Sequence, residues 1–143
     1  MSGQPATEPT VISVIEAGAQ QLEAAHLAYG HGTTNAFDEA AWLVLWRLGL
    51  PLDDLDGVAE RVVAPEEQAR VAALLLQRIQ TRKPAAYLTK EAWLQGVPFY
   101  VDERAIVPRS FIAELLADGT IDAWLVEHTR HVLDLCTGNG SLA

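Results

Sequence analysis

Mostly apolar positions recur at steps of three and four near the start of the chain. They are Ile12, Ile15, Ala19, Leu22, His26 and Tyr29. Because an α-helix has 3.6 residues per turn, this spacing places them on one face. The pattern predicts an amphipathic helix that ends near Gly30.

A second helix is predicted from its end signals. Asn35 is a suitable N-cap, and Asp38 adds favourable negative charge to the first turn. Trp42 and Trp46 are among the bulky residues that follow, and the Gly49–Pro51 segment ends the helix. Since these two tryptophans share an apolar helix face, core packing is favoured over a stacking platform for all four tryptophans, which include Trp93 and Trp124.

Two further helices complete a bundle of about four. Asp53 or Asp54 is expected to cap a short helix to about Val62, and Pro65 opens a longer one that closes at Lys83-Pro84. The buried face predicted for the longer helix consists of Ala69, Ala72, Leu75, Leu76 and Ile79. Its solvated face is expected to carry Arg70, Arg78 and Arg82.

The pattern then changes to short extended runs. Ala92–Leu94, a turn at Gly96 and Phe99–Val101 are typical of a strand, a turn and a strand, and Ala105–Val107 is a third extended piece. This segment predicts a β-hairpin.

A helix capped by Ser110 and a helical segment over 121–126 are expected next, followed by a strand. The apolar run Val132–Leu135 leads directly into Gly138-Asn139-Gly140, as a buried parallel strand does when it presents a backbone loop to a ligand. The fold class predicted from these elements is α+β.

The stretch from Asp134 to Gly140 is the candidate binding site. Glycine permits a close approach of a ligand to the main chain, although a Gly-x-Gly pattern alone is a weak signal. An acid at the strand end is unsuited to a pyrophosphate site, which disfavours a nicotinamide-dependent enzyme. Asp134 suits a cationic group, such as the amine or sulfonium of S-adenosylmethionine; the alternative is an Asp that caps a turn.

Other reactive residues carry weaker signals. Cys136 is more typical of a small packed thiol than of a nucleophile. His128 and His131 lack a third ligand nearby, so no metal site is predicted. Arg109 follows Val-Pro and precedes a helix start, so it is either aimed by a rigid turn or an ordinary surface arginine.

Composition and charge narrow the classes of function. Among 143 residues, half are apolar and one is cysteine, and the net charge is −9. The absence of a long apolar run and of a signal-peptide pattern predicts no membrane span and a cytoplasmic protein. The acidic balance argues against direct nucleic-acid binding, although residues 61–110 carry a net charge of +3 and leave an anionic partner open as an alternative to a solvated helix face. No oligomeric state is predicted.

Three groups of motifs together resemble the HemK/PrmC family of protein glutamine N5-methyltransferases. The first is Arg82-Lys83-Pro84-Ala85-Ala86-Tyr87-Leu88. The second joins Phe99–Arg104 to Val107-Pro108-Arg109-Ser110, and the third is Val132–Gly140. Lys90–Trp93, Pro-Arg-Ser and Cys136 are closest to the PrmB branch, whose substrate is a large-subunit ribosomal protein. Phe111 and Asn139 depart from the usual proline and serine.

The resemblance implies a helical substrate-recognition domain over 1–88, a β-hairpin linker over 89–109 and the start of a methyltransferase domain over 110–143. Only the first strand of that Rossmann-like domain is expected. S-adenosylmethionine would be bound by Asp134, Cys136, Thr137, Gly138, Asn139, Gly140 and Arg109.

The resemblance also implies what this chain lacks. The Asn-Pro-Pro-Tyr motif that holds the glutamine amide is not present, so no catalytic residue and no activity are expected of the chain alone. The alternative is a non-catalytic helical module that binds a basic protein.

Overall fold

The computed structural model describes residues 8–143 of the chain. It divides into two compact units, Met1–Thr89 and Lys90–Ala143. The first unit is helical, and the second contains a β-hairpin, a helix and a long irregular segment. In the described part of the chain, no helix is long and apolar enough to cross a membrane.

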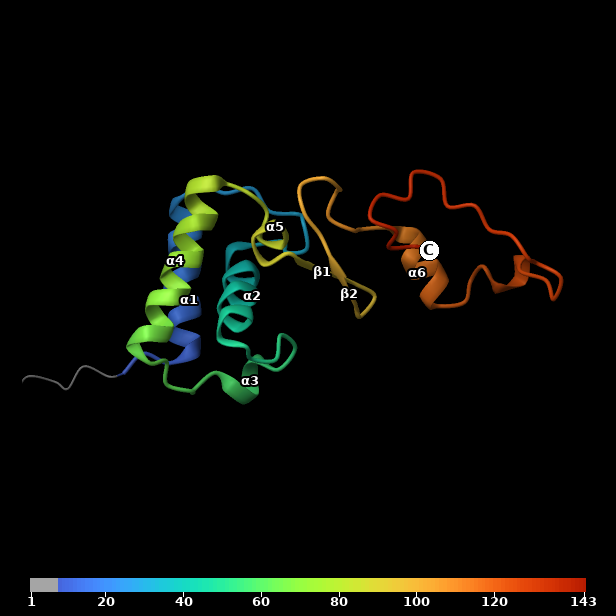
Figure 1. The fold of residues 1–143 in the computed structure, drawn as a ribbon. Coiled ribbons are helices and arrows are strands. Elements are labelled where there is room, and N and C mark those ends of the chain that lie inside the picture. Colours follow the sequence, from blue (N-terminus) through green and yellow to red (C-terminus); the bar gives the residue numbers. More distant parts are fainter. Residues whose placement is uncertain (1–7) are drawn as a thin grey trace, which may run out of the picture. The chain divides into compact units, whose positions relative to one another are not determined.

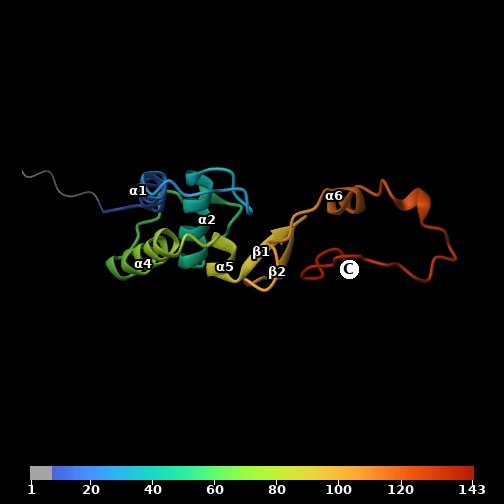
Figure 2. The same cartoon turned by 90° about the horizontal axis from the view of Figure 1, so that it is seen from above.

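The first unit is built around three long helices. Its α1 (Val11–Ala24), α2 (Ala36–Leu48) and α4 (Pro65–Thr81) pack pairwise against one another (Figures 1 and 2). The short α3 (Leu55–Val58) and α5 (Ala85–Thr89) complete it. The fully buried apolar side chains of the core include Val11, Ile15, Leu22, Leu43, Val44 and Val71.

Several predicted ends of these helices are confirmed, but α3 ends at Val58 rather than near Val62. The Asn35 side chain accepts a hydrogen bond from the backbone N–H of Asp38 at 2.8 Å and begins α2. Gly49 ends α2 in the left-handed conformation, with a φ of 67°. Of the two candidate caps for α3, Asp54 is the one that binds the backbone, at the N–H of Gly57.

The first helix is shorter than its apolar period predicts. It ends at Ala24, and His26 takes a positive φ of 48°, so the chain leaves the helical path before Gly30. Leu27 is buried in place of the exposed His26. The reason is tertiary: Arg82 binds the carbonyl oxygens of Ala25 and His26, which fixes a turn there.

The predicted buried face of α4 is wrong at most of its positions. Ala69, Ala72 and Leu76 are exposed, while the buried residues are Val71, Leu74, Leu75 and Arg78. Both sets have helical spacing, so periodicity alone does not choose between them. The sequence predicts Arg78 on the solvated face of the helix. In the structure Arg78 is buried beside the Glu39 carboxylate, so the face that carries Arg78 is the one that packs against the core.

The second unit begins with the predicted hairpin. Strands β1 (Glu91–Leu94) and β2 (Val97–Tyr100) are antiparallel. Gln95 and Gly96 form the two-residue connection and both have positive φ, 49° and 76°. Two positive φ values in a two-residue loop match the right-handed twist of the strands, as in a type I′ turn.

The rest of the second unit is less regular than predicted. Ser110 caps α6 (Phe111–Ala117) as expected, but the segment expected to be helical over 121–126 forms only the 3₁₀ turn η1 (Asp122–Trp124).

Neither Ala105–Val107 nor Val132–Leu135 is a strand, so the Rossmann-like first strand is not seen. Val132, Leu133 and Leu135 are largely exposed. Among residues 8–143, β1 and β2 pair with each other and no third strand offers a ladder of hydrogen bonds to either run.

Candidate functional site

The candidate loop is held by short-range hydrogen bonds. The hydroxyl of Thr137 donates to Asp134 Oδ2 at 2.8 Å, and the backbone N–H of Gly140 donates to the Thr137 carbonyl at 2.9 Å. Asp134 therefore holds the turn through a side-chain hydroxyl, rather than through a backbone N–H as a capping aspartate does. Its carboxylate is still partly exposed and has a second oxygen to offer.

The loop glycines are required by backbone conformation. Gly138 and Gly140 have φ values of 60° and 80°. A Cβ built on either glycine meets no atom within 4 Å. Their main chain thus faces open space, which is the access that a ligand bound to backbone groups needs.

Asn139 contributes an unused donor to the same loop. Its side chain is half-buried, and its Nδ2 atom, which is itself buried, has no hydrogen-bond partner among residues 8–143. A buried donor without an acceptor is costly, so this position favours an acceptor brought by a ligand.

Cys136 and the two histidines give no independent chemistry. Cys136 is exposed and has a φ of 61°, so its interpretation as a packed thiol is wrong. His128 and His131 are exposed as well. In the described chain, no three metal-ligating side chains lie close enough together to hold an ion.

Arg109 lies at the start of α6. Val107 and Pro108 before it are buried, and Ser110 after it accepts the Ile112 N–H as the helix cap. The arginine side chain is exposed between these two fixed neighbours. The exposed side chain is compatible with both interpretations of Arg109, the aimed guanidinium and the ordinary surface arginine.

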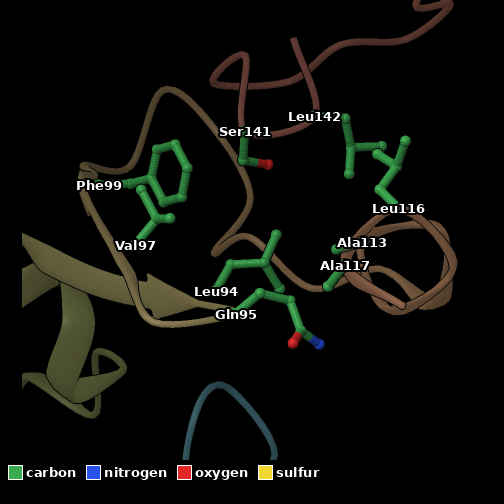
Figure 3. Close-up of a pocket in the computed structure, with 9 residues that line it drawn as sticks. All are labelled: Leu94, Gln95, Val97, Phe99, Ala113, Leu116, Ala117, Ser141 and Leu142. Atoms are coloured by element: carbon green, nitrogen blue, oxygen red, sulfur yellow. The ribbon is translucent and has the colours of Figure 1, made fainter. Parts of the chain in front are cut away.

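An apolar pocket adjoins the candidate loop within the second unit. It has a volume of about 300 Å³ (Figure 3). It is lined by Leu94, Gln95, Val97, Phe99, Ala113, Leu116, Ala117, Ser141 and Leu142. Ser141 and Leu142 directly follow Gly140, so the pocket and the loop share one stretch of backbone. Its lining comes from three separate segments, which is why no single sequence motif indicates it.

The helical unit contains a buried polar cluster that the sequence did not indicate. Arg78 Nε donates to Glu39 Oε1 at 2.6 Å, and both side chains are at least 96% buried. Thr33 Oγ1 donates to the other Glu39 oxygen at 3.0 Å, and Arg78 Nη2 donates to the Ala28 carbonyl at 3.1 Å. These bonds fix the connector between α1 and α2.

Tyr29 belongs to the same cluster. Burial raises the pKa of the Tyr29 hydroxyl, and the nearby Glu39 carboxylate raises it further. Within residues 8–143, neither its hydroxyl nor Arg78 Nη1 has a hydrogen-bond partner.

The four tryptophans fall into two classes. Trp42 and Trp46 are half-buried against the core of the helical unit, as predicted. Trp93 on β1 and Trp124 in η1 are 49% and 82% exposed, so core packing is wrong for this second pair.

A charged cluster follows β2. The Arg104 guanidinium donates to both oxygens of Asp102, at 2.9 Å from Nε and 2.7 Å from Nη2. Tyr100 donates its hydroxyl to Asp102 at 3.2 Å. The hydrogen bonds from Arg104 hold the pKa of Asp102 far below its usual range.

Comparison with known proteins gives the chain its relatives. No protein-family model matches it. The ribosomal protein uL3 glutamine methyltransferase of Burkholderia pseudomallei is 48% identical over 100% of the chain and 47% of the relative. The enzyme of the same name from Bordetella pertussis is 48% identical over 94% of the chain and 45% of the relative. The enzyme of the same name from Neisseria meningitidis is 45% identical over 100% of the chain and 48% of the relative.

The chain thus spans about half the length of the curated relatives it matches. Identity of this level along the whole chain far exceeds what a shared Gly-x-Gly turn alone produces. The resemblance drawn from the three groups of motifs is confirmed. Over its full length, the chain is related to a segment that makes up about half of each ribosomal protein uL3 glutamine methyltransferase that it matches.

Proposed function

We propose that this chain provides the substrate-recognition and first cofactor-binding part of a methyltransferase that modifies a glutamine side chain of ribosomal protein uL3. The observation that carries the proposal is the 45–48% identity to three enzymes of that name. Under this proposal the helical unit recognises the substrate, the hairpin links it to the catalytic domain, and residues from 110 onward begin that domain.

The loop from Asp134 to Gly140 fits S-adenosylmethionine as the methyl donor. Asp134 offers a carboxylate oxygen to the cationic amine, and Asn139 offers an unused amide donor. Gly138 and Gly140 leave the main chain open to the ligand. Thr137 orients the aspartate, while Cys136 and Arg109 complete the set of expected cofactor-binding residues.

The chemistry requires a well-oriented nucleophile. When bound, S-adenosylmethionine supplies an electrophilic methyl group on sulfonium. A glutamine amide nitrogen is a poor nucleophile, so its alignment with the methyl group accounts for much of the rate. Residues of this chain would bind the cofactor and the substrate protein, and the groups that hold and align the amide would come from the part of the relatives that this chain does not match.

The net charge supports the choice of a basic substrate. Residues 1–60 contain nine acidic residues and one basic residue, a net charge of −8. A protein that binds ribosomal RNA carries lysines and arginines to neutralise phosphates. Attraction between opposite charges speeds the encounter and disfavours acidic partners.

Methyl transfer to purified uL3 tests the proposal. The 143-residue chain is fused to the part of the B. pseudomallei enzyme that it does not match, and transfer of a radiolabelled methyl group is measured. We expect the fusion to methylate uL3 at one glutamine and the 143-residue chain alone to be inactive. Mass spectrometry of the labelled peptide identifies the modified residue.

The variant Asp134→Asn in the same fusion tests the proposed cofactor contact. The amide still accepts the Thr137 hydrogen bond but carries no charge for the cofactor amine, so we expect KM for S-adenosylmethionine to rise about tenfold. A folded fusion that binds uL3 but methylates nothing, or methylates only a different protein, would refute the proposed function.

A further inference from the structure

One face of the β-hairpin is aromatic and unusually exposed. The register pairs Glu91 with Tyr100 and Trp93 with Pro98. Alternate residues of a strand and their cross-strand partners lie on one side of a sheet, so these four residues share a face. Trp93 is 49% exposed and Tyr100 is 64% exposed. We call this set the hairpin aromatic face.

The opposite side of the hairpin already supplies its packing. Ala92 is buried and Phe99 is half-buried, and Leu94, Val97 and Phe99 line the apolar pocket of the second unit. In Figure 3, Val97 and Phe99 extend from one strand of the hairpin beside that pocket. The hairpin aromatic face therefore has no comparable role in packing this unit.

Both rings of this face are fixed by hydrogen bonds. Trp93 Nε1 donates to Glu91 Oε1 at 2.6 Å. Tyr100 donates its hydroxyl to Asp102, which Arg104 holds in turn with two further bonds. Side chains that are ordered before binding lose less entropy when a partner arrives, and tryptophan and tyrosine are enriched among residues that dominate binding energy.

The charges around the rings select a cationic partner. Glu91 lies directly against the indole N–H of Trp93, whereas Asp102, at the hydroxyl of Tyr100, is already paired with Arg104. The second unit carries eight acidic and four basic residues, a net charge of −4. Aromatic faces attract lysine and arginine, and the net negative charge of the unit strengthens that preference, whereas a phosphate backbone would be repelled.

We propose that the hairpin aromatic face binds a lysine- or arginine-containing segment of uL3, whose cationic side chains stack on Trp93 and Tyr100. This inference rests on the proposed function for the identity of the partner. It assigns to the hairpin a direct contact with substrate, in addition to its expected role as a linker.

The test is a titration of the 143-residue chain with purified uL3. Chemical shifts of the tryptophan indole N–H groups are followed by NMR, and dissociation constants are measured by calorimetry. We expect the Trp93 signal to shift, and Trp93→Ala and Tyr100→Ala to weaken binding about tenfold or more. Trp124→Ala is the matched control: this tryptophan is also exposed and in the same unit, so its loss should change the dissociation constant less than about twofold.

Two conservative variants separate binding from folding. Glu91→Gln retains an acceptor for the Trp93 indole but loses its charge, and should weaken binding severalfold at low salt and less at high salt. Tyr100→Phe retains the ring and should bind within about threefold of the unmodified chain. Hairpin amide signals verify that each variant keeps the β1–β2 pairing.

Several results would overturn the inference. Equal binding of uL3 by the Trp93→Ala and Trp124→Ala variants would exclude the face as the contact. A Trp93 shift with oligouridine but not with uL3 would assign it to RNA instead. If the fusion methylates uL3 while the folded hairpin variants have unchanged affinity, the proposed function stands and this inference fails; if the fusion does not methylate uL3, the proposed function fails.

Discussion

Arg78 and Glu39 form the ion pair on which the helical unit depends most. A buried charge is tolerated only while its partner and hydrogen bonds remain, because water is not present to replace them. Arg78 is 1% exposed and bonds both the carboxylate and the Ala28 carbonyl. Loss of the guanidinium would leave the Glu39 charge in an apolar core.

We predict that Arg78→Met lowers the free energy of unfolding by about 3 kcal/mol. Arg70→Met on the same helix is the control, because Arg70 is exposed and its loss should cost less than about 0.5 kcal/mol. Urea denaturation followed by circular dichroism measures both. Adding Glu39→Gln to Arg78→Met removes the unpaired charge and should restore part of the stability. Equal losses of stability in Arg78→Met and Arg70→Met would contradict this account.

The predictability of single residues depended on whether their role was local. Asn35 and Ser110 were correctly predicted as caps because a cap binds a backbone group two or three residues away. Arg78 was assigned wrongly to solvent because its partner, Glu39, lies 39 residues earlier. The exposed Cys136 shows the same difficulty, since nothing in its neighbourhood of sequence reveals what surrounds it.

Among the elements, the start of α4 is stabilised by a glutamate whose contribution depends on pH. Glu67 accepts hydrogen bonds from Arg61 at 2.8 Å and from the backbone N–H of Ala64 at 3.1 Å. The bond from Arg61 is the larger cause of a Glu67 pKa below its ordinary value of 4.5, and the bond from Ala64 is the second. Because the pKa is lower in the folded chain, the charged form stabilises the fold.

The stabilisation by Glu67 should therefore be fully present above about pH 5 and disappear as the pH falls through the lowered pKa. We predict that Glu67→Gln is less stable than the unmodified chain at pH 7, and that the difference shrinks as the pH falls through the lowered pKa of Glu67. Thermal unfolding at a series of pH values measures it. Glu66→Gln is a control on the same turn. If the stability difference between Glu67→Gln and the unmodified chain grew on acidification, the charged form of Glu67 would not be the stabilising one.

The elements of this chain were predictable to the extent that they are stabilised from within. The hairpin was found because Gln95 and Gly96 encode its turn and its strands pair with each other. The apolar run Val132–Leu135 was expected to be a strand, but a strand requires neighbours that come from elsewhere in the chain. The end of α1 at Ala24 was missed for a related reason, since Arg82 sets it from 57 residues away. The glycines of the candidate loop indicate its place in the sequence. The adjoining pocket is lined by three separate segments, so no sequence pattern predicts it.

At the scale of the whole molecule, the two units differ in how their backbones are satisfied. The helical unit has three packed helices around a shared core. From η1 to Ala143, the backbone bonds are turns such as Thr129 to Val126 and Gly140 to Thr137. Many apolar side chains of that segment, including Leu125 and Leu133, are exposed.

We predict a corresponding contrast in amide hydrogen exchange. Amides of α2 should be protected by a factor of about a thousand or more, and those of Val126–Leu135 by less than about ten, because isolated turns open without unfolding the core. Mass spectrometry of exchanged peptides measures both, with the urea-unfolded chain as the reference. Equal protection of the two segments would mean that Val126–Leu135 is packed or paired in solution.

Arg78 in α4 and Arg82, which caps the end of α4, also set the order in which the helical unit can be completed during synthesis. Arg78 binds the Ala28 carbonyl across 50 residues, and Arg82 binds that of His26 across 56. A ribosome releases the chain from its N-terminus, so α1 and α2 emerge long before either arginine does. The two helices can meet early through their apolar faces, but the connector between them acquires its final shape only when the end of α4 has left the exit tunnel.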